Sequence, residues 1–253
     1  MTPSDSILSH RTVLLGVTGS VAAIRVPALI QLLVARGASV VVVRTRHARH
    51  FLSDAEIDAV AASTDCSRVR RYDDVHEWEQ WRALGDPVLH IELRRQADVF
   101  LVAPLSANTL AKLANGLADN LITCTARAWD WQRRPVWLAP AMNTAMYEHP
   151  FTAEHLQRLM RLGARVLPPV HKRLACGDEG VGAMPSPEAI VTGMEEGLRA
   201  MTTMVAGPRP AHPSAPLYPT PLTPAAIDRF ADPPALPATA RAPDAAPHSP
   251  PSL

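Results

Sequence analysis

A glycine-rich segment holds a cysteine in surroundings that suit chemistry. Cys176 lies within KRLACGDEGVGAM, residues 172–184, which has three glycines within six residues. Such a run predicts a mobile loop, and lids over active sites are often loops of this kind. In a loop the thiol need not be buried, and basic residues lie close to it in the sequence. A lone cysteine is more often an inert core residue, but this setting makes Cys176 a candidate reactive group.

Two turns are suited to binding an anion. GVTGSV, residues 16–21, joins an expected strand to an expected helix, and its glycine lets backbone amides approach a ligand. PLSANT, residues 104–109, opens a second helix with Ser106 as its N-cap. A nucleotide phosphate is the usual occupant of such turns, and two of them fit a ligand lying across the carboxyl edge of one sheet. The plainer alternative is a pair of well-capped helices.

Two further polar residues extend this set of candidate groups. Asn143 follows an expected strand in APAMN, and its amide can both donate and accept hydrogen bonds toward a bound polar group. His90 lies in DPVLHIELRR, and a histidine can act as a base or can orient a ligand near neutral pH. Alone, a histidine is more often structural. Arg94 or Arg95 could pair with an anionic ligand group. The alternative is an ion pair with a carboxylate at the surface or at a subunit interface.

The elements that must position these residues alternate along the chain. Short apolar runs predict strands at residues 12–17, 39–43, 99–103, 136–139 and 165–167. Apolar periodicity predicts helices at residues 21–34, 106–115, 121–129, 152–162 (with a start that can lie a few residues earlier) and 187–201. This alternation predicts a single doubly wound α/β domain with a Rossmann/flavodoxin-like parallel sheet. Residues 55–69 have weak periodicity, which indicates a surface insertion or an irregular helix.

Composition narrows the class of protein. The 253 residues are 47% hydrophobic and 19% charged, which is typical of a globular protein, and the net charge of +1 gives no support for nucleic acid or a membrane as partner. No run approaches the ~18 apolar residues that span a bilayer, and the first ten residues lack a signal-peptide core. We therefore expect a cytoplasmic protein. Three widely spaced cysteines predict neither a disulfide framework nor a metal site.

The two ends differ from the rest of the chain. We expect a disordered N-terminus over residues 1–10, a folded domain over 11–204 and a disordered Pro/Ala-rich tail over 205–253. From Pro208 onward the chain holds fourteen of its 25 prolines among few large apolar residues, so this segment buries too little surface to offset its ordering entropy. The tail is either a solvated extension or a segment that binds a partner through extended Pro-rich motifs.

Five blocks together resemble one known family. They occur in order between about Thr12 and Leu198: DPVLHIELRR, APLSANTLAKLANGLADNLITC, RAWD, PAMNTAMYEHP and ACGDEGVGAM. In combination they resemble the flavin-containing cysteine decarboxylases, specifically the phosphopantothenoylcysteine decarboxylases of the eukaryotic single-domain type. The resemblance implies a homotrimer with FMN at subunit interfaces. It also implies decarboxylation of 4′-phospho-N-pantothenoylcysteine to 4′-phosphopantetheine, an intermediate of coenzyme A biosynthesis.

The resemblance also assigns roles to residues. It makes His90 the catalytic histidine and Cys176 a proton donor late in the reaction. It places substrate contacts at Asn143, which binds the carboxylate, and at Met142, Arg95, Arg173, Leu174 and Ala175. It places cofactor contacts at Gly19, Ser20, Val21, Thr45, Arg46, His47, Phe51, Ser106, Ala107, Asn108, Thr109 and Ala141. Oxidation of the CH2–SH unit by FMN would create a C=S group that accepts the electrons left by departing CO2.

Three other functions share these features. Some relatives are regulatory subunits that inhibit a protein phosphatase, but those usually carry a long acidic tail, which this chain lacks. A peptidyl-cysteine decarboxylase would use the same chemistry on a peptide C-terminus. A flavin prenyltransferase has a similar fold but would not need Cys176. Trp78 and Trp81 precede the histidine block, and we expect them to pack in the core or in a trimer interface.

Overall fold

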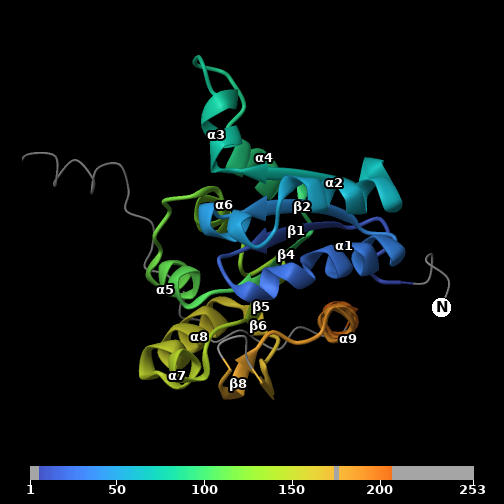
Figure 1. Ribbon diagram of the computed structural model, residues 1–253. Helices are drawn as coiled ribbons and strands as arrows, with labels where there is room; N and C mark the ends of the chain where they lie inside the picture. Colours follow the sequence, from blue (N-terminus) through green and yellow to red (C-terminus); the bar gives the residue numbers. More distant parts are fainter. Residues whose placement is uncertain (1–5, 174–176, 207–253) are drawn as a thin grey trace, which may run out of the picture. The chain divides into compact units, whose positions relative to one another are not determined.

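Six parallel strands form the central sheet of this domain. The computed structural model describes residues 6–173 and 177–206 (Figure 1). The sheet order is β3-β2-β1-β4-β5-β6, the order of a doubly wound Rossmann-type fold. The strands are β1 (Thr12–Val17), β2 (Ser39–Arg44), β3 (Val69–Asp73), β4 (Val99–Leu105), β5 (Val136–Pro140) and β6 (Ala164–Val166). The order reverses between β1 and β4, and this is where such sheets bind ligands.

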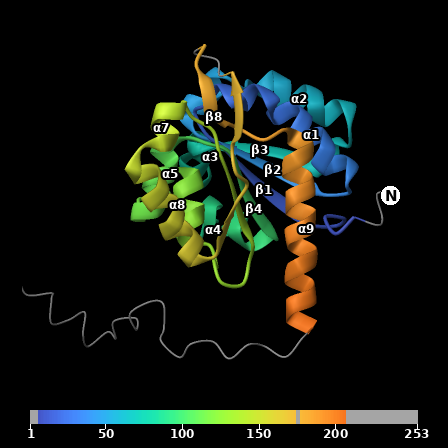
Figure 2. The ribbon, with the colours of Figure 1, turned by 90° about the horizontal axis from the view of Figure 1, so that it is seen from below.

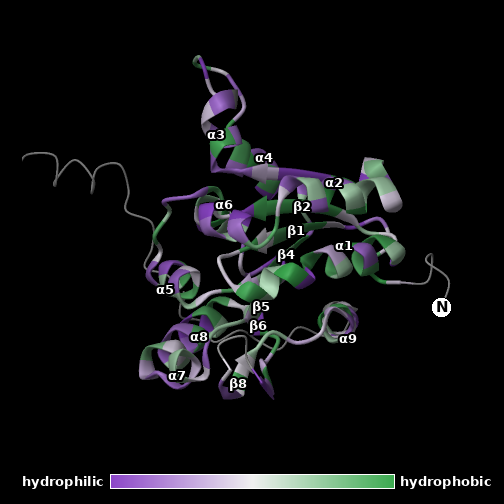
Figure 3. Cartoon of the chain, in the orientation of Figure 1, coloured by the Kyte–Doolittle hydropathy of each residue, from purple (hydrophilic) through white to green (hydrophobic). Residues whose placement is uncertain are grey.

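Helices cover both faces of the sheet. One face packs against α1 (Val26–Ala35), α2 (Asp54–Ser63) and α9 (Pro187–Ala206), and the other against α4 (Leu89–Gln96), α5 (Ala107–Asn115), α6 (Leu121–Ala128) and α8 (Pro150–Leu162). Neighbouring strand residues point to opposite faces, so Leu14 and Leu15 enter different cores. Figure 2 shows α9 and α1 apart from α5 and α8, and Figure 3 shows the apolar strands between them.

The strands buried between helices follow the sequence prediction closely, within one or two residues at most ends. The helix expected at residues 21–34 begins as a 3-10 helix, η2 (Val21–Arg25), before α1 continues it. Within the described residues, no helix has both the length and the apolar character that crossing a bilayer requires.

The weakly periodic segment is part of the fold and is not a surface insertion. It forms the regular helix α2, which begins at a capping box of Ser53 and Glu56, then a 3-10 turn, η4 (Cys66–Arg68). The chain continues directly into β3, which pairs in parallel with β2. The periodicity is weak because α2 buries only Ile57 and Val60. Since β3 is an edge strand with charged residues, the sequence did not predict it.

The start of the chain is more ordered than we expected. Residues 6–10, predicted to be disordered, form a turn in which Leu8 is fully buried. The hydroxyl of Ser6 donates a hydrogen bond of 2.6 Å to Glu195 on α9. This buried polar contact and the Leu8 side chain join the turn to the core. Helix α9 extends to Ala206, two residues past the predicted domain end. Residues 1–5 and the tail from residue 207 lie outside the described residues.

The glycine-rich segment is largely a β-hairpin where we expected a loop. β7 (Val170–Arg173) pairs antiparallel with β8 (Glu179–Ala183), and residues 174–176 between them lie outside the described residues. The glycines of β8 serve close packing. A Cβ on Gly180 would lie 2.5 Å from Thr144 Oγ1, and one on Gly182 would overlap the Met142 carbonyl. The backbone of β8 is therefore pressed against the turn that carries Asn143.

A helical arm carries exposed apolar side chains. It consists of α3 (Asp74–Gln80) and the connection to α4, and Figure 1 shows α3 projecting away from the sheet. Trp78 is 78% exposed, Trp81 is half exposed and Leu84 is 99% exposed. Packing of the two tryptophans in the core of this chain, one of our two expectations, is therefore wrong. Packing against another subunit stays a prediction.

Candidate active site

A cavity of about 890 Å³ opens at the carboxyl ends of β1, β2 and β4, where the strand order reverses. All the residues predicted to contact a cofactor line it: Gly19, Ser20, Val21, Thr45, Arg46, His47, Phe51, Ser106, Ala107, Asn108, Thr109 and Ala141. The structure thus brings together turns that are up to about 120 residues apart in the sequence. Their contact with a cofactor stays a prediction.

Thr18 fastens two of these turns to each other. Its side chain is fully buried, and its hydroxyl donates to the carbonyl of Pro104 at 2.7 Å. The same oxygen accepts from the backbone amide of Ser106 at 2.8 Å. A third turn approaches closely, because a Cβ on Gly19 would lie only 2.7 Å from His47 Cβ. Glycine at position 19 is therefore required by the contact between the turns after β1 and β2.

The start of α5 supplies an anion-binding end to the cavity. Ser106 caps the helix, and its hydroxyl accepts a 3.4 Å hydrogen bond from the amide of Thr109. The helix N-terminus carries free amides and a partial positive charge, which favour a phosphate. Arg46 and His47 line the same cavity from the segment after β2. Lys112 also lines it but pairs with Asp119.

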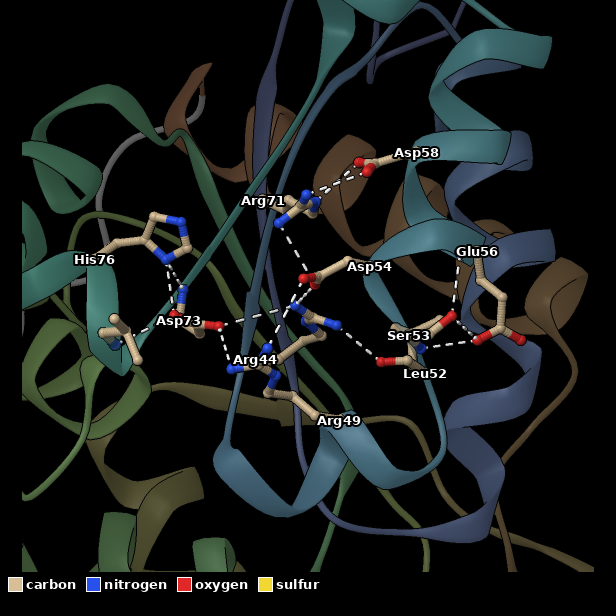
Figure 4. A network of polar contacts seen from close by, with 11 residues as sticks. Arg44, Arg49, Leu52, Ser53, Asp54, Glu56, Asp58, Arg71, Asp73 and His76 are labelled. Atoms are coloured by element: carbon tan, nitrogen blue, oxygen red, sulfur yellow. Dashed lines mark hydrogen bonds and ion pairs between the residues drawn. The ribbon is translucent and has the colours of Figure 1, made fainter.

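A buried arginine fixes the segment that carries Thr45, Arg46 and His47. The side chain of Arg44 is only 1% exposed; it donates to the Leu52 carbonyl at 2.8 Å and pairs with Asp54 (Figure 4). Arg49 adds an ion pair of 3.1 Å to Asp73. A buried guanidinium is tolerated only when carboxylates and carbonyls surround it in this way. Arg44, at the end of β2, thus fixes the far end of the following loop through its contacts with Leu52 and Asp54.

Asp73 joins this network to the helical arm. It is the N-cap of α3, where its carboxylate accepts from the Val75 amide at 3.1 Å and contacts His76 Nδ1 at 2.7 Å. Burial alone would raise the pKa of Asp73, but the hydrogen bond and charge of His76 and the charge of Arg49 outweigh it and lower that pKa. Asp73 therefore joins the start of the arm to Arg44 and Arg49, which hold the loop after β2.

A second cavity of about 400 Å³ lies between η2 and the hairpin. It shares Ser20, Val21, Ala141 and Met142 with the larger cavity, so the two adjoin. Of the residues predicted to bind substrate, Met142, Asn143 and Arg173 line it. Arg25 and Lys172 line it too, which makes its surroundings basic. Leu174, Ala175 and Cys176 lie outside the described residues, so their predicted roles stay predictions.

Asn143 already holds a carboxylate in this structure. Its Oδ1 caps α7 (Thr144–Glu148) by accepting from the Ala145 amide at 2.8 Å. Its Nδ2 donates to the carboxylate of Asp178 at 2.7 Å. Asp178 lies in the hairpin, between the strands. The amide is therefore oriented so that Nδ2 donates to an oxyanion, and its predicted contact with a substrate carboxylate stays a prediction.

The structure does not bring His90 and Arg95 to these cavities. Both lie on α4, and neither lines the two cavities described above. The Arg95 side chain is 63% exposed and pairs with Glu92 at 2.6 Å on the helix surface. His90 Nδ1 lies 2.5 Å from the carboxylate of Glu77 on α3. Within one chain, the predicted catalytic histidine thus lines neither the cavity of the predicted cofactor residues nor that of the predicted substrate residues.

Several residues of the site were not foreseen from the sequence. The larger cavity is also lined by Asp74, Lys112, Asp119, Asn120 and Met146. Asp74 Oδ1 accepts from the Leu121 amide at 2.8 Å, and burial, the largest effect, raises the pKa of Asp74. The sequence signal for Asp74 was its position just after a strand, which was missed because β3 itself was missed. Glu77 had no such signal, since its partner lies thirteen residues away.

Fold and site together define a nucleotide-binding α/β protein, and comparison with known proteins places it in a family. The sequence profile of the Flavoprotein family matches residues 1–198, so the chain belongs to this family. It is 51% identical over 180 residues to the phosphopantothenoylcysteine decarboxylase of Mus musculus, an alignment that covers 71% of this chain and 83% of the mouse protein.

Solved structures agree with this placement. A cysteine-to-serine mutant of PPC decarboxylase complexed with pantothenoylaminoethenethiol is 46% identical, with a TM-score of 0.69. That match covers 75% of this chain and 98% of the other. The FMN-binding protein AtHal3 is 47% identical with a TM-score of 0.67, and the match covers 75% of this chain and 97% of AtHal3.

Proposed function

We infer that this chain is an FMN-dependent carboxy-lyase that converts 4′-phospho-N-pantothenoylcysteine to 4′-phosphopantetheine in coenzyme A biosynthesis. The observation that carries this inference is the cavity at the carboxyl ends of β1 and β4, where the strand order reverses. Every residue expected to contact FMN lines this cavity. The identity of 51% to a phosphopantothenoylcysteine decarboxylase supports the substrate and the reaction.

The residues around the larger cavity suit FMN. The N-terminus of α5, the Arg46 guanidinium and the His47 imidazole match a phosphate monoester. Gly19 lets the turn after β1 pack against His47, which lines the same cavity. Phe51, Ala141 and Met146 offer aromatic and apolar surface for a flavin ring. FMN, when bound, supplies the two-electron oxidation of the substrate and the later return of those electrons.

The chain's own residues bind the substrate and supply protons. In this proposal the Nδ2 of Asn143 binds the substrate carboxylate in place of Asp178, so substrate entry loosens the contact between the hairpin and the Asn143 turn. Arg25, Lys172 and Arg173 provide the positive charge that a phosphorylated substrate needs near the smaller cavity. Cys176, carried between β7 and β8, donates the late proton when the hairpin covers the site.

We further propose that the protein acts as a homotrimer in which His90 serves the cavity of a neighbouring subunit. Two observations support this. His90 does not line either cavity of its own chain, although the resemblance makes it catalytic. The arm next to it exposes Val75, Trp78, Trp81 and Leu84, an apolar surface that favours burial against another subunit.

The proposed function is tested with the purified full-length protein. Its visible spectrum reports FMN, and mass spectrometry follows 4′-phosphopantetheine formation with CO2 release. We expect a yellow protein that turns over, an accumulated ene-thiol intermediate with Cys176→Ser, and almost no turnover with His90→Asn. A yellow protein without turnover would instead favour a regulatory role. A colourless protein that fails to bind added FMN would contradict the proposed function.

A further inference from the structure

A carboxylate from the helix of the arm contacts the predicted catalytic histidine, which lies on the next helix, α4. Glu77 lies on α3 and His90 on α4, and Glu77 Oε1 is 2.5 Å from His90 Nδ1. The pair is well shielded, since the side chains are only 13% and 25% exposed. Charge-assisted hydrogen bonds in such surroundings are short and directional. The contact therefore restricts both the rotation and the protonation pattern of the His90 ring.

The hydrogen bond distinguishes the two ring nitrogens of His90. A carboxylate only accepts, so Nδ1 must carry a hydrogen and donate it to Glu77. Among the described residues, Nε2 of His90 makes no hydrogen bond, so its lone pair is left for the reacting group. The other oxygen of Glu77, Oε2, is buried and also has no hydrogen-bond partner among the described residues. Among the described residues, the contact with His90 is thus the only hydrogen bond of the Glu77 carboxylate.

The position of Glu77 is fixed by contacts that other residues of α3 make. Asp73 caps the helix and binds His76 and Arg49, and Asp74 accepts from the Leu121 amide at the start of α6. Figure 4 shows Asp73 and His76 at the edge of the Arg44 network. The two histidines thus make different kinds of contact. His76 contacts Asp73 at the N-terminus of its own helix, whereas the contact of His90 with Glu77 joins two helices.

We propose that Glu77 is a positioning residue for the decarboxylation, acting through His90. It selects the tautomer of His90 with the proton on Nδ1 and leaves Nε2 to act on the reacting group. Carboxylates that orient metal-bound histidines change activity by about 10- to 100-fold when removed, and we expect an effect of similar size here. The inference rests on the proposed function, since it needs a reaction in which His90 takes part.

The test compares Glu77→Gln and Glu77→Ala with Glu79→Gln, an exposed glutamate on the same helix. We expect Glu77→Ala to lower kcat about 10- to 100-fold and Glu77→Gln less, with KM, FMN content and oligomer size close to wild type. Nitrogen-15 NMR of labelled histidine, with His90 assigned from the spectrum of His90→Asn, reports the tautomer directly. It should show hydrogen on Nδ1 in wild type and in Glu79→Gln, and a shift toward the Nε2–H form in Glu77→Ala.

Unchanged kcat in both Glu77 variants, or an Nε2–H tautomer in wild type, would overturn the inference. If Glu77→Gln loses FMN and also dissociates into smaller species, the pair has a structural role, and the inference is overturned as well. If Glu77→Ala fails to fold, the shape-conserving Glu77→Gln carries the kinetic test. If the wild-type protein shows no turnover, the proposed function fails, while the NMR spectrum still decides whether Glu77 sets the tautomer.

Discussion

The cofactor pocket and the helical arm differ in how complete they are within one chain. The pocket is closed by buried groups of the same chain, with Thr18 joining two turns and Arg44 fixing a third. The arm presents exposed apolar side chains, including Trp78 and Leu84, beside a histidine that lines neither cavity. One chain can therefore form a place for a flavin, whereas the histidine predicted to be catalytic lines neither of its cavities. This difference is the basis of the proposal that subunits share an active site.

Filling the space at Gly19 should have the largest effect on the pocket side. A Cβ there would lie 2.7 Å from His47 Cβ, so Gly19→Val must separate the turns after β1 and β2. We expect FMN content, measured from the visible spectrum, to fall more than about tenfold, with turnover lost in proportion. Gly16→Ala is the matched control, because its Cβ would make only ordinary contacts, the nearest at 3.4 Å. Equal FMN content in both variants would refute this role for Gly19.

Polar substitutions on the arm should weaken the proposed contact between subunits. Trp78→Ser with Leu84→Ser removes two of the most exposed apolar side chains of the described residues. We expect dissociation to monomers by light scattering and loss of most turnover, while the fold by circular dichroism persists. Met160→Ser on α8, also exposed, serves as control. Trimers that persist in the double variant would show that the arm is not the interface.

The sequence alone predicts more of the cofactor pocket than of the helical arm. The turns after β1 and β4 were predictable, because ligands of doubly wound sheets bind at strand carboxyl ends and buried strands read as apolar runs. β3 was missed since an edge strand alternates with charged residues. The β8 glycines were misread because glycine serves mobility and close packing alike. The Glu77–His90 pair depends on how two helices pack, which no local pattern reports.

Removing Arg44 should sharpen the comparison, since its network links the pocket to the arm. Arg44→Met leaves Asp54 and Asp73 without their buried partner, which we expect to cost about 3 kcal/mol of unfolding free energy in urea. Arg133→Met removes a pair that is 88% exposed on the arginine side and should cost less than about 1 kcal/mol. A similar small loss in both variants would mean that the network contributes little to holding the pocket.

Acid should weaken the same network by a smaller amount. The pKa of Asp73 is lowered in the folded protein, so its contribution is complete above the ordinary pKa of 3.8 and is lost as pH falls through the folded value. Thermal unfolding between pH 6 and about pH 3 should show a steeper fall for wild type than for Asp73→Asn, which keeps the helix cap but cannot titrate. Parallel curves would assign the acid sensitivity to other carboxylates.

The most direct test of a shared active site is to mix two inactive chains. His90→Asn and Asn143→Ala, carried on different affinity tags, are coexpressed, and trimers holding both tags are purified. If His90 of one subunit serves the pocket of the next, each mixed ring contains one intact site, and turnover returns to about one third of wild type. If each chain uses its own histidine, the mixed trimers stay as inactive as the two single variants, and that result would contradict the account.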